Sequence, residues 1–111
     1  MAVLPLNTFK TIAKPVPTSK TGIYTCPAGY TAIILLAQVS NIGTQTGNIQ
    51  FIHVRLNNET FLVKNTPIPV EDALSVLTGR LVLQDGDSIR ILGSVDSQLQ
   101  IVLSIVESAN A

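Results

Sequence analysis

Few residues of this chain have side chains suited to catalysis or metal binding, and they are scattered along it. The single histidine, His53, lies in the apolar segment 51–55, and the single cysteine, Cys26, lies beside Pro27. A metal site needs several strong ligands that converge, and a thiol nucleophile needs a base beside it. His53 and Cys26 are far apart in the sequence and have no clustered partners. We therefore predict no catalytic residue, no metal ion and no cofactor.

Two pairs of acidic residues are the remaining candidates for chemistry. Asp85 and Asp87 flank Gly86, but the further oxygen ligands and the closing bidentate acid of a calcium loop are missing. We interpret this segment as a turn between two strands. Glu71 and Asp72 are interpreted as loop acids that cap a helical turn. Paired carboxylates for glycoside hydrolysis stay open as an alternative, although loop acids rarely have that role.

The composition limits the classes of partner. Hydrophobic residues make up 46% of the chain and charged residues 13%, and seven basic residues balance seven acidic ones. A surface that binds nucleic acid by charge needs several lysines or arginines together, so we expect no nucleic-acid partner. The longest apolar run, residues 32–37, is far shorter than a membrane span, and no leader pattern opens the chain. We expect no membrane partner either.

The first nineteen residues differ from the rest. Three prolines interrupt them, and their lysines, together with Lys20, have no acid among them. Proline favours extended chain over helix. We predict an extended N-terminal arm over residues 1–19, with a short strand at residues 8–12, followed by one β-sandwich domain over residues 20–111. The arm lies either across its own domain or across a neighbouring subunit.

The remaining segments alternate between apolar and polar residues and are separated by turn signals. The clearest is residues 98–107, which place Leu99, Ile101, Leu103 and Ile105 on one face. Seven to nine such strands predict an all-β fold, an antiparallel β-sandwich that is jelly-roll-like. Residues 30–42 form a long strand that is apolar on both faces in its first half. One face should belong to the core, and the other should be covered by the arm, a loop or a partner.

These patterns point to a set of interface residues. Four lie in the arm, two lie on one face of the long strand, and two form a polar patch on the strand that carries the histidine. The predicted interface residues are Phe9, Lys10, Ile12, Lys14, Ile34, Leu36, His53 and Arg55.

Three segments carry a resemblance to a known class of protein. They are residues 21–32 (TGIYTCPAGYTA), residues 81–89 (LVLQDGDSI) and residues 103–107 (LSIVE). Together they resemble small virion structural proteins of tailed phages, cyanophages in particular. The resemblance spans residues 21–107 and rests on turns and strands, so no functional residue carries over from it.

The resemblance implies a virion component and does not fix its place in the particle. From the cationic, proline-interrupted arm and the surplus apolar surface of the long strand, we predict a capsid decoration or cement protein. Because the chain has few ionisable groups, we predict that it is not an enzyme. Its partners would be further copies of itself, with a trimer as one arrangement, and the major capsid protein or other virion proteins. It would be located in the virion, which is assembled in the host cytoplasm. A tail, baseplate or fibre-associated component is the first alternative. A carbohydrate-binding module is more remote, because the chain has no tryptophan and few aromatic residues to stack on sugars.

Overall fold

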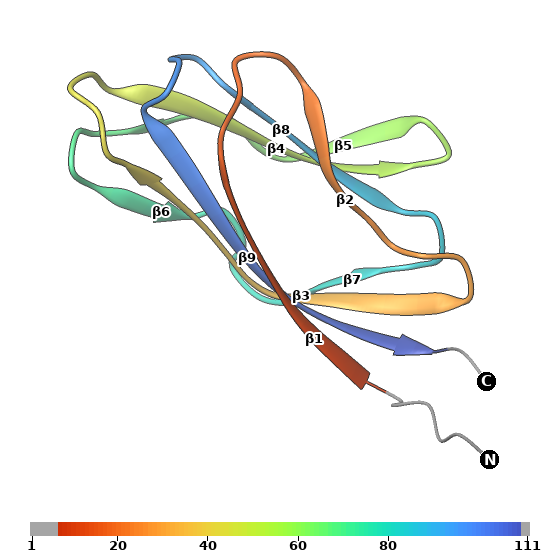
Figure 1. Cartoon of the computed structure of the whole chain (residues 1–111). Helices are drawn as coiled ribbons and strands as arrows, with labels where there is room; N and C mark the ends of the chain where they lie inside the picture. The colour runs from red at the N-terminus through yellow and green to blue at the C-terminus, as the bar shows by residue number, and fades with distance from the viewer. Residues whose placement is uncertain (1–6, 110–111) are drawn as a thin grey trace.

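The computed structural model describes residues 7–109, which form two antiparallel β-sheets packed face to face without a helix (Figure 1). The predicted all-β sandwich is thereby confirmed. The strands are β1 (Asn7–Pro15), β2 (Thr21–Thr25), β3 (Tyr30–Asn41), β4 (Gly47–Arg55), β5 (Asn58–Ile68), β6 (Ala73–Ser75), β7 (Leu81–Leu83), β8 (Ser88–Gly93) and β9 (Leu99–Ala109).

Most consecutive strands lie in different sheets. Sheet A has the order β1-β9-β3-β6, and β7 also pairs with β3, whereas sheet B has the order β2-β8-β4-β5. Only the β4–β5 hairpin and the β6–β7 connection join strands of the same sheet. The chain therefore crosses repeatedly between the two sheets. The helical turn expected at residues 71–74 is absent, and residues 73–75 form the short strand β6 against β3.

Alternating side chains from both sheets fill the space between them. Leu99, Ile101, Leu103 and Ile105 of β9 are at most 1% exposed, as the alternation predicted. Phe51 of β4 packs against the same cluster from sheet B. Each such side chain contributes about 1.5–3 kcal/mol by leaving water. The sandwich is therefore held mainly by its apolar interior.

A β-bulge in β3 changes which residues face the core. The pairing with β9 shifts register between Ile34 and Leu36. Ile34 is fully buried, Leu35 and Leu36 are each 40% exposed, and Ala37 is buried again. The bulge thus moves Leu36 to the outward side of the strand, where Ile33 also lies. It also corrects the prediction for Ile34, which belongs to the core and is not available to a partner.

Part of the predicted arm is a strand of the sandwich itself. β1 pairs with β9 over its whole length and forms one edge of sheet A. The strand predicted at residues 8–12 is thus confirmed and extends to Pro15. The chain is then fastened by Val16, which is 1% exposed and donates its backbone N–H to the Leu99 carbonyl at 2.8 Å. Residues 1–6 of the predicted arm lie outside the described residues.

Candidate interaction face

The outward-facing residues of sheet A form rows that cross the strands. Directly opposite residues of paired strands place their side chains on the same face. Phe9 of β1 pairs with Val106 of β9, Val106 pairs with Ile33 of β3, and Ile33 pairs with Val82 of β7. Val106 alternates with inward-facing Ile105, so the whole row points away from the core. An apolar row therefore runs from one edge of sheet A to the other.

The two ends of this row are well exposed, whereas Ile33 and Val106 are half-buried. Phe9 is 74% exposed and Val82 is 52% exposed, and the bulge adds Leu35 and Leu36 beside them. The next rows consist of small or uncharged polar residues together with Ala13, Pro15 and Val102. We call the outward residues of these rows the outer face of sheet A. They are Phe9, Thr11, Ala13, Pro15, Ile33, Leu35, Leu36, Gln38, Ser40, Val82, Gln100, Val102, Ser104 and Val106.

None of these fourteen side chains carries a charge. Protein interfaces are depleted of charge at their centres, and large exposed apolar patches commonly mark contact sites. A sheet face that stays in water normally carries charged residues, which also prevent unwanted association. The outer face of sheet A thus has the composition of a surface that is covered by protein.

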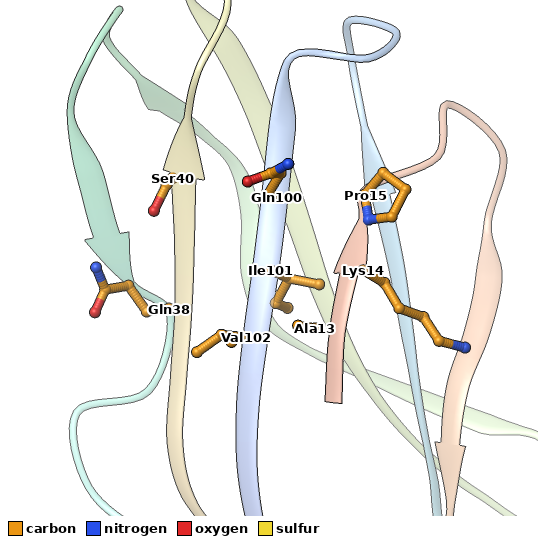
Figure 2. Close-up of a pocket in the computed structure, with 8 residues that line it drawn as sticks. All are labelled: Ala13, Lys14, Pro15, Gln38, Ser40, Gln100, Ile101 and Val102. Atoms are coloured by element: carbon orange, nitrogen blue, oxygen red, sulfur yellow. The ribbon is translucent and has the colours of Figure 1, made fainter. Parts of the chain in front are cut away.

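A shallow groove crosses the polar half of this face. Figure 2 shows Gln38 and Ser40 of β3, Gln100 and Val102 of β9, and residues 13–15 of β1 around it. Its volume is about 360 Å³. The Lys14 side chain, its one charged residue, extends away from β9. The groove therefore lies within the uncharged surface and makes this part of the face concave.

The outer face of sheet B is different. Arg90, which lies between two core residues of β8, points outward and places its Nη1 atom 3.0 Å from Glu59 Oε2. Lys20 Nζ lies 3.0 Å from the other oxygen of Glu59, and this hydrogen bond keeps the pKa of Glu59 below its ordinary value. Ile52, which pairs with both Arg90 and Phe61, is fully buried. The outer face of sheet B thus carries charged groups, and its Phe61 is 37% exposed.

The predicted arm residues divide between the two faces of β1. Phe9 lies on the outer face of sheet A, as does Leu36 from β3. Lys10, Ile12 and Lys14 lie opposite core residues of β9 and therefore face the interior side, at its edge. Ile12 packs against the core, and Lys14 stays exposed. The structure thus brings only Phe9 and Leu36 together on one interaction face.

Lys10 belongs to a polar cluster that joins the two sheets. Its Nζ atom lies 3.1 Å from Oε1 of Glu107, a side chain that is 5% exposed. Tyr24 of sheet B donates its hydroxyl hydrogen to the other carboxylate oxygen at 2.5 Å. Burial favours a higher pKa for Glu107, but the hydrogen bonds from Tyr24 and Lys10 bring this pKa below its ordinary value. Burial and this carboxylate also raise the pKa of Tyr24.

His53 and Arg55 meet at a buried acid. Arg55 Nε donates to Asp87 Oδ1 at 2.9 Å, and its Nη2 donates to Oδ2 at 2.6 Å. His53 Nε2 and the backbone N–H of Gln84 also contact Oδ2, at 3.0 and 2.9 Å. These bonds, those from Arg55 first, hold the pKa of Asp87 well below its ordinary value although burial opposes them.

The shared face that we predicted for His53 and Arg55 is therefore present, but their polar atoms are used within the chain. Sequence reasoning placed Asp87 in a turn and missed its role as their partner. The available signal was its position at the start of β8, because β8 pairs with the end of β4 that carries these two residues.

The two depressed carboxyl pKa values predict acid sensitivity. In the unfolded chain these groups titrate near pH 4, and in the folded chain they titrate at lower pH. Their contribution to stability is therefore complete above about pH 5 and is lost as the pH falls below about 4 through the folded pKa values. Urea unfolding between pH 7 and pH 2 should show a falling free energy of unfolding below pH 4. The fall should be shallower in Asp87→Asn, and an identical slope would contradict this role of Asp87.

Other reactive groups are placed in the interior or stand apart. Cys26 is 1% exposed, and burial raises the pKa of its thiol. Within residues 7–109, no three His, Cys, Asp or Glu side chains gather as metal ligands would. The same residues contain no helix with the length and apolarity needed to cross a membrane.

Comparison with solved structures shows where this fold occurs. A structure of Bacillus endospore appendages, described as disulfide-linked pili, is similar at a TM-score of 0.57 and 13% identity, over 100% of this chain and 98% of that one. The nucleoplasmin-like N-terminal domain of Drosophila FKBP39 is similar at 0.54 and 13%, over 99% and 98%. A pentameric capsid protein from metagenomic phage sequences is similar at 0.43 and 14%, over 97% and 64%.

The first two likenesses show the fold alone, because the identities are far too low to carry a function. No protein-family model matches the sequence. No curated protein matches it either. The chain is thus an antiparallel β-sandwich whose fold is similar to those of the endospore appendage and the nucleoplasmin-like domain.

Proposed function

We propose that this protein is a structural component of a phage particle and that it decorates or cements the capsid shell. The observation that carries the proposal is the uncharged, partly apolar outer face of sheet A. Covering such a face with protein is favourable, because apolar surface leaves water and no charged group has to be desolvated. The resemblance of residues 21–107 to virion proteins of tailed phages supports the same function.

The charged residues of the chain support a structural function as well. Asp87 and Glu107, the two buried acids, are each held by several donors from other strands. They fasten β4 to the β7–β8 turn and sheet A to sheet B. The two carboxyl groups with lowered pKa values therefore stabilise the sandwich. This structural role is consistent with a protein that serves as a component of a particle.

The attachment to the shell would use the free edge of β1. β1 is an edge strand, so the side of its backbone that faces away from β9 is unpaired within the sheet. Phe9 projects from this edge and is the most exposed residue of the apolar row. An edge strand of this kind can pair with a strand of a neighbouring protein. The major capsid protein is the partner that this proposal implies.

Gold-labelled antibodies against the protein test this proposal on intact particles in the electron microscope. We expect label over the shell of particles and none on particles assembled without the gene, which serve as the control. Label confined to the tail or baseplate would contradict capsid decoration and favour a tail component. Particles that carry no label at all, from cells that make the protein, would contradict a virion function altogether.

A further inference from the structure

We infer that the outer face of sheet A is a self-association surface on which a second copy of this chain packs face to face. This inference rests on the composition and shape of that face and does not depend on the proposed function. The occupant must satisfy three conditions. It must cover enough area, it must bring no unpaired charge, and it must match a sheet in shape.

The area is sufficient for a specific pair. Sheet A is four strand positions wide, and β1 pairs with β9 over nine residues. With strands about 4.8 Å apart and a rise of about 3.3 Å per residue, the face measures about 19 by 30 Å. Two copies would then bury about 1,100 Å² in total, if each face is treated as a flat rectangle. A specific interface needs roughly 1,000 Å².

Charge favours the same face of a second copy as the occupant. A charged side chain buried against the apolar row would lose its hydration without gaining a partner. The outer face of sheet B carries Lys20, Glu59 and Arg90, so contact with that face would impose this cost. The outer face of sheet A brings no charge at all. Of the two outer faces, only the outer face of sheet A can cover the outer face of sheet A without burying an unpaired charge.

The shape is compatible with a two-fold pair. Sheets pack face to face at about 10 Å with their strands nearly aligned. If the two-fold axis lies between the two sheets and parallel to the strands, the apolar rows of the two copies meet. Phe9 at one edge then lies over Val82 at the opposite edge of the partner, and Val106 lies over Ile33. Each contact occurs twice, as a two-fold interface requires.

The mass of the full chain in solution tests this inference. Sedimentation or light scattering between about 1 and 500 µM should give twice the 11.8 kDa mass of one chain at the upper concentrations. Leu36→Glu should raise the dissociation constant by about 100-fold or more, because each copy then buries a carboxylate against an apolar face. Val82→Glu is the second variant at an exposed position, so the test survives if one variant folds poorly.

Leu56→Glu is the matched control. Leu56 is 89% exposed and lies in the β4–β5 turn, away from the face. The Leu56→Glu substitution introduces the same charge in place of the same kind of side chain. It should leave the mass of the assembly in solution unchanged. Melting curves of all the variants check that each is folded. A single-chain mass for the wild-type protein up to 500 µM would overturn the inference, and so would an assembly of any size that folded Leu36→Glu and Val82→Glu leave intact.

Discussion

Replacing Ile34 with alanine is expected to lower the free energy of unfolding by about 2–5 kcal/mol. The side chain is fully buried between the sheets, so its loss removes apolar burial and leaves a cavity. Leu36→Ala, two residues along the same strand, should cost less than about 1 kcal/mol, because exposed substitutions have small effects. Urea unfolding at neutral pH, at a concentration where the chain is a monomer, measures both values.

This pair of variants tests the bulge directly. In a regular strand, Ile34 and Leu36 would lie on the same face and would respond alike. The bulge at Leu35 separates them into a core residue and a surface residue. Similar losses of stability for the two variants would show that β3 is regular here. That result would also remove Leu36 from the outer face of sheet A.

Replacing Asp87 with alanine is the second large effect, and we expect it to cost about 2–3 kcal/mol at pH 7. The change removes the acceptor of the Gln84 backbone N–H and the partner of His53 Nε2, both at part-buried positions. Arg55 is 45% exposed and regains water, so its share of the loss is discounted. Thermal and urea unfolding provide the measurement.

The matched control is Asp85→Ala in the same turn. Asp85 accepts one hydrogen bond, from the Gly29 backbone N–H at 2.7 Å, and that bond is exposed. Its removal should cost clearly less than the removal of Asp87. Equal losses for the two variants would mean that the turn alone matters and that the Asp87 cluster adds nothing.

The sequence predicted the strands well because alternation and turn residues are local signals. Residues 99–105 have a large apolar residue at every second position, and these residues are the buried ones in β9. The turn at Asp85, Gly86 and Asp87 is present between β7 and β8, with Gly86 at a φ of 82°. The sandwich follows from the number of such strands and from their apolar faces.

What the sequence did not predict depends on pairing between distant strands. The bulge in β3 is a register shift against β9, and no local pattern distinguishes it from a strand that is apolar on both sides. We expected an interface at Lys10, Ile12 and Lys14 because the sequence alone does not show that this part of the arm pairs with β9. Once β1 pairs with β9, the alternation of β1 turns these three residues inward and leaves Phe9 outside.

Local sequence patterns also could not predict the candidate interaction face. Its apolar row takes one residue from each of four strands, and these residues lie at positions 9, 33, 82 and 106. Each of them alone is an ordinary exposed or half-exposed residue in the sequence. Only the register brings them together, and only then does the absence of charge over the whole set become visible. Phe9 and Leu36 were the two predicted residues that belong to it.

Thiol labelling of Gln38→Cys measures most directly whether protein covers the outer face of sheet A. Gln38 is exposed on this face in the single chain, Thr60 is exposed on β5, and the natural Cys26 is buried and gives little background. At high protein concentration, Gln38→Cys should react much more slowly than Thr60→Cys, and dilution should abolish the difference. Equal rates for the two cysteines at every concentration would show that the face stays in water, contrary to this account.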